Sequence, residues 1–154
     1  MSNGTKVKKR DGRIEPLDLD KMHLMVDEAC RGLANVSASQ VEMQSGIQFY
    51  DGITTDEIQE ILIKSASDLI DLEHPNYQFV AARLLLFSLR KQMFGRRSEH
   101  PELIDHITEK CYSGVYDKDI FVKYSKEEIE KVGQWVDHDR DFLFTYAGLR
   151  QVVD

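Results

Sequence analysis

The sequence of 154 residues is poor in cysteine and proline and contains no long apolar run. Its two cysteines, Cys30 and Cys111, cannot form a disulfide framework or a zinc site unaided. No apolar stretch approaches the ~18 residues of a membrane span, and the first residues lack the apolar core of a signal peptide. We therefore expect a cytoplasmic protein with no membrane partner. A chain of this length buries roughly two thirds of its unfolded surface, so it needs no disulfide or metal to fold.

Sequence motifs of catalysis are also missing. Neither of the phosphate-binding glycine patterns, G-x-x-x-x-G-K-[ST] and G-x-G-x-x-G, occurs, and no cysteine has a C-x-x-C partner. The spacing reveals no Ser/His/Asp or Cys/His grouping. His138 lies among carboxylates, but the helix dipole favours acidic residues at a helix start without any metal. The sequence therefore assigns this chain no catalytic residue and no metal site.

The chain lacks an excess of positive charge. Its net charge of −7 repels nucleic acid and anionic lipid unless charge is segregated locally, and we expect no nucleic-acid partner. Charge is in fact segregated. Residues 1–13 carry five basic side chains and one acidic, whereas residues 98–154 carry seven basic and thirteen acidic. The basic tip could meet a phosphate-bearing ligand, or it could be a solvated hairpin edge on which lysines prevent edge pairing.

The first half of the chain carries clear local signals. Residues 7–15 predict a β-hairpin in which Asp11 and Gly12 form a tight type I′ turn. A helix is predicted from a cap at Asp18 to Gly32, and a second over 37–45, where Ser37 and Gln40 fit a capping box. The short aromatic segment 47–50 could be a third strand.

Two longer helices follow, and then weaker ones. Thr54 and Glu57 form a capping box at the start of a long helix. Pro75 opens the next helix, which is apolar on more than one face and is therefore expected to be central, and which ends at Gly95. After a boundary at 96–101 we expect helices at about 101–113, from Ser125 and from near 137. The abrupt end resembles a truncated helix, so we expect the front piece of a longer chain.

The predicted fold class is α+β and mostly α. Residues 1–95 form a four-helix bundle capped by a small β-hairpin or three-stranded sheet, and residues 96–154 form a helical extension. Without a glycine-rich loop, a nucleoside triphosphate needs lysines and arginines from separate elements. Lys9, Arg10, Lys21 and Lys91 could converge if the hairpin folds over the bundle. Because neighbouring strand residues point to opposite faces, Arg10 must swing round at the turn.

Helical spacing adds further candidate site residues. It places Leu84, Phe87, Ser88 and Lys91 on one helix face, and Thr55 beside Gln59 on another. Simpler interpretations remain open: Phe87 can be plain core, and Lys91 can complement the helix C-terminus. Asp18 and Thr55 can belong only to helix starts.

Several segments together resemble an ATP-cone. These are residues 7–12 (VKKRDG), 19–21 (LDK), 51–55 (DGITT), 81–84 (AARL) and 89–91 (LRK). Others resemble the N-terminal region of the class I ribonucleotide reductase large (alpha) subunit, and they are residues 45–53 (SGIQFYDGI), 75–78 (PNYQ), 112–117 (YSGVYD) and 138–142 (HDRDF). The resemblance covers essentially the whole chain.

The resemblance implies a regulatory role in an oxidoreductase that makes deoxyribonucleotides for DNA synthesis. In that family the cone is the overall-activity site, where ATP keeps the enzyme on and dATP turns it off. The effector, ATP or dATP, can carry Mg²⁺, and no redox cofactor is expected in this chain. The implied partners are the remainder of the large subunit and the small radical-bearing (beta) subunit, in a homo-oligomer of the complete subunit. The family's catalytic barrel and its active-site cysteines are expected beyond residue 154, so the chain alone is expected to be inactive.

The family pattern also implies a nucleotide-binding set, which falls on Val7, Lys9, Arg10, Glu15, Lys21, Thr55, Phe87 and Lys91. Lys9, Arg10 and Lys91 would hold phosphates. Glu15 and Lys21 would frame the base and sugar, and Val7 and Phe87 would supply apolar walls. Three further positions depart from the pattern: Asp18 replaces an asparagine, and Gln59 and Ser88 each replace a histidine.

Two other interpretations stay open at this point. The chain could be a cone-fold interaction module that has lost nucleotide binding and docks to the rest of the reductase through residues 98–154. A cone-bearing transcriptional repressor would instead carry a zinc ribbon ahead of the cone, and the chain has no C-x-x-C there.

Overall fold

A small mixed sheet lies at one end of the molecule. The computed structural model describes residues 4–95, 97 and 99–154. Strand β1 (Lys6–Lys8) pairs antiparallel with β2 (Ile14–Pro16) and parallel with β3 (Ile53–Thr54), in the order β2-β1-β3. Val7 and Ile53 are buried neighbours across β1 and β3, so this inner face of the sheet packs on the helices.

The predicted hairpin forms, but its turn is not of type I′. The Lys9 amide donates to the Arg13 carbonyl at 2.8 Å, and the Gly12 amide donates to the Lys9 carbonyl at 2.9 Å. Gly12 has φ +86°, whereas Asp11 does not have a positive φ. This is the three-residue loop in which a type I turn is followed by a left-handed glycine. The prediction of two positive φ values was therefore wrong, and Arg10 lies in the turn rather than on a strand.

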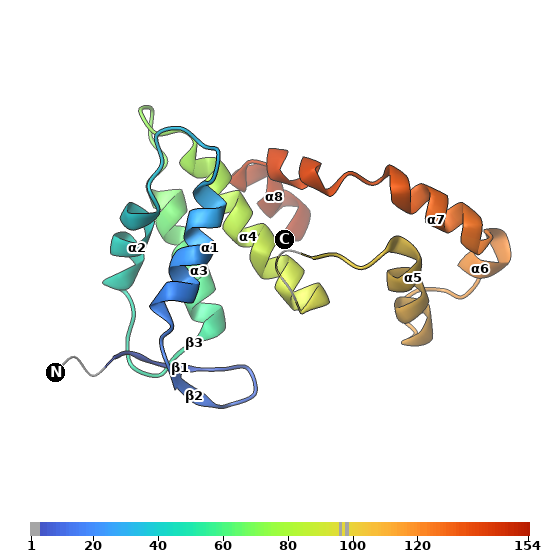
Figure 1. Cartoon of the computed structure of the whole chain (residues 1–154), viewed down its shortest axis with the longest axis horizontal. Coiled ribbons are helices and arrows are strands. Elements are labelled where there is room, and N and C mark those ends of the chain that lie inside the picture. The colour runs from blue at the N-terminus through green and yellow to red at the C-terminus, as the bar shows by residue number, and fades with distance from the viewer. Residues whose placement is uncertain (1–3, 96, 98) are drawn as a thin grey trace.

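Four helices form the bundle above this sheet (Figure 1), as the sequence predicts: α1 (Leu19–Cys30), α2 (Ala38–Gly46), α3 (Thr55–Asp68) and α4 (Tyr77–Phe94). Helix α4 is central and packs against α1, α3 and the later helix α8. Its residues Val80, Ala81 and Leu84 are completely buried. Gly95, with φ +75°, ends α4 where expected.

Helix caps show where local signals were sufficient. The Asp18 carboxylate accepts the Lys21 amide at 2.9 Å, and Thr54 with Glu57 forms the predicted capping box of α3. The capping box predicted at Ser37 and Gln40 is wrong, because the Ser37 side chain makes no cap hydrogen bond. The buried Tyr77 hydroxyl replaces it by accepting from the Ser37 amide at 3.0 Å and donating to Gln40 Oε1 at 2.8 Å.

The strand considered at 47–50 is also wrong. The chain turns there after α2, and Ile47 is 82% exposed. The third strand instead consists of residues Ile53 and Thr54, which lie just after the Asp51-Gly52 turn. Asp51 Oδ1 accepts from the Lys6 amide at 2.8 Å, which fixes this turn beside β1.

Residues 99–154 form an elongated helical arm (Figure 1) that consists of α5 (Leu103–Tyr112), α6 (Ile120–Lys123), α7 (Lys126–Trp135), the 3₁₀ helix η1 (His138–Leu143) and α8 (Tyr146–Val153). Helices α5 and α7 pack on each other, and α7 begins with the predicted capping box of Ser125 and Glu128. The single helix predicted from near 137 is wrong. It breaks at Phe144, and Thr145 caps α8 by accepting the Gly148 amide.

The end of the arm returns to the bundle. Helix α8 packs against α4, and Leu149 joins the main core. Phe142 lies edge-on to Phe87, with centroids 6.4 Å apart, and the guanidinium carbons of Arg83 and Arg90 lie 5.4 and 5.3 Å from its ring centroid. The domain boundary between residues 95 and 96 stays a prediction. Apolar side chains of residues 138–153 pack against α4, so this end of the arm shares the core of the bundle. Across residues 4–95, 97 and 99–154, no helix has the length and apolarity to span a membrane.

Candidate functional site

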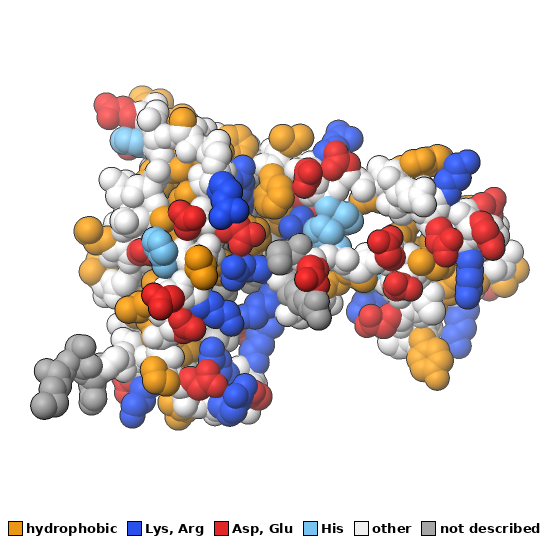
Figure 2. Space-filling model, viewed as in Figure 1, with side chains coloured by type: hydrophobic (Ala, Val, Ile, Leu, Met, Phe, Trp, Pro, Cys, Tyr) orange, Lys and Arg blue, Asp and Glu red, His pale blue; other side chains and the backbone are white. Residues whose placement is uncertain are grey.

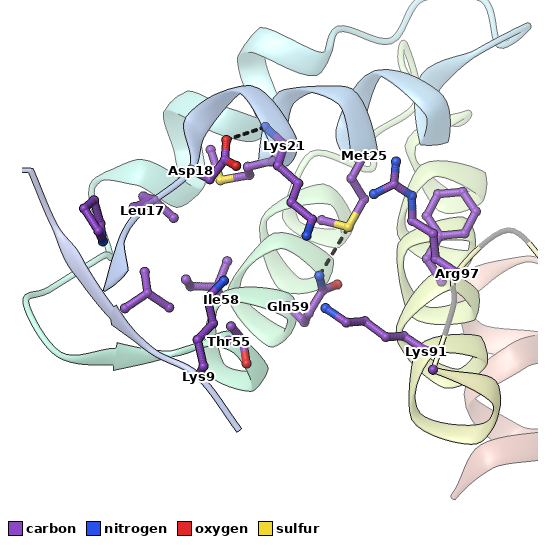
Figure 3. A pocket seen from close by; sticks show the side chains of 15 residues that line it. Lys9, Leu17, Asp18, Lys21, Met25, Thr55, Ile58, Gln59, Lys91 and Arg97 are labelled. Carbon is purple, nitrogen blue, oxygen red and sulfur yellow. Dashed lines mark hydrogen bonds between the residues drawn. The ribbon is translucent and has the colours of Figure 1, made fainter. Parts of the chain in front are cut away.

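A pocket of about 240 Å³ opens where the hairpin meets the helix bundle (Figure 3). The hairpin and the segment that follows it form one wall, and α1, α3 and α4 form the others. The lining residues are Val7, Lys9, Pro16, Leu17, Asp18, Lys21, Met22, Met25, Thr55, Ile58, Gln59, Phe87, Lys91, Gly95 and Arg97. Figure 2 shows lysines and arginines gathered over this side of the molecule, between the hairpin and the bundle.

Most of the residues predicted from the sequence meet in this pocket. Those that line it are Val7, Lys9, Asp18, Lys21, Thr55, Gln59, Phe87 and Lys91. They come from the hairpin, the start of α1, the first turns of α3 and the second half of α4. Because the sheet packs its inner face on the helices, elements far apart in the chain contribute to one site.

Three predicted residues lie outside the lining. Arg10, in the hairpin turn, donates to Asp56 Oδ1 from Nε at 3.0 Å and from Nη2 at 2.7 Å. The Glu15 carboxylate lies 3.5 Å from Lys9 Nζ and so accompanies a lining residue. Ser88 is buried in α4, where its hydroxyl accepts from Gln92 Nε2 at 3.4 Å.

The pocket concentrates positive charge. In Figure 3, Lys9, Lys21 and Lys91 extend toward the same space from three different elements. Burial lowers the pKa of Lys91, and the nearby cations of Lys21, Arg10 and Lys9 lower it further, while Asp56 acts in the opposite direction. Within the part of the chain that the structure describes, neither Lys21 nor Lys91 has an ion-pair partner. A negatively charged ligand would therefore relieve the repulsion among these cations.

Apolar walls and one unsatisfied polar atom complete the pocket. Val7 and Phe87 are each only 2% exposed, and Ile58 is buried beside them. Gln59 Nε2 lies 3.2 Å from Met25 Sδ, and Gln59 Oε1 is buried without a hydrogen-bond partner among the described residues. A buried amide oxygen without a donor costs about 1–3 kcal/mol. A ligand that brings a donor to this atom would recover that free energy.

Asp18 has two roles in this geometry. Its carboxylate caps α1, as the simpler interpretation held, and the same side chain lines the pocket. Lys21, whose amide Asp18 accepts, also lines the pocket. Helix capping therefore fixes the position of one cationic lining residue relative to one anionic residue.

Some lining residues were not among the predicted set. Met22, Met25 and Ile58 carried a signal, because each lies on the apolar face of its helix, and the pocket lies over these faces. Arg97 carried none: it stands in a boundary segment with no periodicity, and the fold alone brings it beside α1. Lysines, an arginine and several apolar side chains line the pocket, so this site suits binding of an anion with an apolar part.

His138, the histidine among carboxylates, lies beside a second histidine and an aspartate. In the described ranges, no group of three or more His, Cys, Asp or Glu residues could hold a metal ion. His138 stacks on His100 with ring centroids 3.7 Å apart, and its Nδ1 lies 3.7 Å from Asp141 Oδ2.

Comparisons with known proteins agree with the geometry. The ATP cone domain family matches residues 5–92. The chain is 47% identical over 152 residues to ribonucleoside-diphosphate reductase 1 subunit alpha of Escherichia coli, covering 99% of this chain and 20% of that protein. The subunit alpha of Haemophilus influenzae is 43% identical over 152 residues, with 99% and 20% covered, and that of Helicobacter pylori is 38% identical over 150 residues, with 96% and 18% covered. The chain thus spans about a fifth of the length of these relatives. It belongs to the ATP cone domain family and is similar, over nearly its whole length, to the N-terminal part of ribonucleoside-diphosphate reductase alpha subunits.

Proposed function

We propose that the pocket binds an adenine nucleotide, ATP or dATP, as an allosteric effector. In this proposal the chain is the N-terminal regulatory region of a ribonucleoside-diphosphate reductase large subunit. The observation that carries the proposal is the convergence of Lys9, Lys21 and Lys91 on an apolar slot. The slot also contains a buried amide oxygen that has no hydrogen-bond partner among the described residues.

The lysines supply the phosphate subsite. A triphosphate needs several cations, and their ammonium groups act as separate point charges along it. The pKa of Lys91 is lowered by burial and by neighbouring cations, and a phosphate beside it would restore the pKa toward its usual range. The Arg10 guanidinium, held by Asp56 at the hairpin turn, adds positive potential from outside the lining.

The apolar part of the pocket suits the base and sugar. Val7, Leu17 and Ile58 line the pocket with apolar side chains, which offer a surface for a planar base. Gln59 Oε1 needs a hydrogen-bond donor, and a ribose hydroxyl or an exocyclic amino group of the base provides one. The residues present therefore fit a nucleotide in both charge and hydrogen bonding.

Binding of this chain to nucleotides is tested directly by calorimetry and thermal denaturation with ATP, dATP and GTP. At a hundredfold excess over the dissociation constant, a ligand stabilises the folded chain by about 2.7 kcal/mol. Lys91→Ala is expected to remove most of this stabilisation. Lys64→Ala is the matched control, because Lys64 is an exposed lysine paired with Asp68 outside the pocket.

Failure to bind ATP or dATP at millimolar ligand would refute the nucleotide proposal. It would favour the alternative, a cone-fold module that only docks to the rest of the reductase. Comparison of ATP with dATP measures how the site senses a single 2′-hydroxyl, and allosteric coupling of this kind typically amounts to about 1–3 kcal/mol.

The proposed partners are the remainder of the large subunit and the small radical-bearing subunit. We assign the oxidoreductase activity to the complete subunit and not to this chain. Burial raises the pKa of the Cys30 thiol to about 11, with a further contribution from Asp27, and Cys111 is buried. This raised pKa keeps the Cys30 sulfur in the thiol form, whereas the reactive form is the thiolate.

A further inference from the structure

Arg97 brings positive charge into the pocket from outside the four-helix bundle. It lies two residues beyond Gly95, the end of α4, in the segment that leads to α5. Its side chain lines the end of the pocket away from Lys9, beside the later turns of α1 (Figure 3). In Figure 3, Lys91 is drawn between Lys9 and Arg97, so these three cations form a row across the pocket in that view.

A carboxylate of the same chain holds Arg97. Its Nε donates to Glu28 Oε2 at 3.2 Å, and both side chains are about 30% exposed. Glu28 stands in the last turn of α1, a turn with no basic residue. A carboxylate is unfavourable at this end of a helix because the helix dipole is negative there. The ion pair with Arg97 offsets this local cost.

The same arrangement recurs at the other end of the pocket. Lys9 is paired with Glu15, and Arg10 with Asp56. The cations at the two ends of the row are thus held by carboxylates, while Lys21 and Lys91 in the middle have no such partner within the described ranges. Arg97 lines the same pocket as these lysines, and its planar guanidinium can bind phosphate oxygens in a bidentate manner.

We infer that Arg97 is a further phosphate-binding residue, which exchanges its ion pair with Glu28 for the terminal phosphate when a nucleoside triphosphate binds. This inference rests on the proposed function and extends it to selectivity for phosphate-chain length. Glu28 acts as an internal competitor of the ligand. Removal of Arg97 and removal of the Glu28 charge must therefore change affinity in opposite directions.

The test is isothermal calorimetry of the whole chain with ATP and with AMP. Arg97→Ala is expected to weaken ATP binding by about tenfold, the scale of one charge-assisted hydrogen bond, and to leave AMP binding within about twofold. Glu28→Gln is expected to tighten ATP binding by about threefold, since it removes one exposed competing charge. Loss of folding cannot imitate this tightening.

The neighbouring ion pair provides matched controls. Arg31 and Asp27 also pair at the end of α1, at 3.9 Å, but neither lines the pocket. Arg31→Ala and Asp27→Asn should leave ATP affinity within about twofold, as expected for exposed charges. If the wild type binds ATP and either the Arg97 or the Glu28 variant behaves like its control, the inference is wrong while the proposed function stands. If the wild type binds no nucleotide, the proposed function fails and this inference fails with it.

Discussion

Replacement of Tyr77 by phenylalanine removes one hydroxyl that connects two helices. This hydroxyl accepts from the Ser37 amide at 3.0 Å and donates to Gln40 Oε1 at 2.8 Å, and the side chain is only 1% exposed. A hydrogen bond contributes about 0.5–1.5 kcal/mol net, so loss of both costs at most about 3 kcal/mol. Gln40 is exposed and can turn to water, whereas the Ser37 amide is half-buried. We therefore expect Tyr77→Phe to lower the free energy of unfolding by about 1–1.5 kcal/mol.

Urea denaturation followed by circular dichroism measures this change. With a slope of about 1–3 kcal/mol per molar urea, the midpoint should fall by roughly 0.5–1 M at unchanged slope. Tyr112→Phe is the control, because Tyr112 is 91% exposed and its change should have no effect. Ser37→Ala completes the comparison. Since the Ser37 side chain makes no cap hydrogen bond, we expect a change below about 0.5 kcal/mol. A neutral Tyr77→Phe together with a loss of about 1 kcal/mol for Ser37→Ala would refute this reasoning and restore the side-chain cap.

Three further predictions concern the turn, the arm and the pocket. Gly12→Ala should lower the free energy of unfolding by about 1 kcal/mol. The cost comes from the left-handed φ alone, because no atom lies within 4 Å of an added Cβ. Gly12→Asn should cost less, and urea midpoints measure both changes. Phe142→Ala should lower the free energy of unfolding by about 2–4 kcal/mol, because it removes aromatic and cation–π contacts with α4. A loss below about 1 kcal/mol in the same assay would contradict the packing of η1 on that helix. In the folded chain the pKa of Lys91 is below its ordinary value of 10.5. The unfolded chain therefore binds more protons at alkaline pH values just below 10.5, and the free energy of unfolding should rise with pH in that range. Lys91→Met should flatten this rise. The free energies of unfolding of the wild type and the variant, measured at several alkaline pH values, test this. Equal slopes against pH in the two proteins would count against the buried cation.

The sequence predicted eight of the residues that line the pocket, chiefly through the resemblance to the ATP-cone family. Helical spacing by itself places only Thr55 with Gln59, and Phe87 with Lys91, on common faces. It could not place Arg97. That residue reaches α1 through a salt bridge between positions 69 residues apart, and no periodic pattern connects them.

The sequence by itself determined the features that depend on residues three or four apart. The caps at Asp18, Thr54 and Ser125 and the glycine stop at Gly95 form as expected, because each satisfies helix ends within one turn of the chain. Only the tertiary structure decided which segment pairs with β1, which hydroxyl binds the amide at the start of α2, and which cations share one pocket. These outcomes depend on segments far apart in the sequence, which compete for the same backbone hydrogen-bonding groups, buried surface and charged partners. The packing of the whole chain decides which of these segments come into contact.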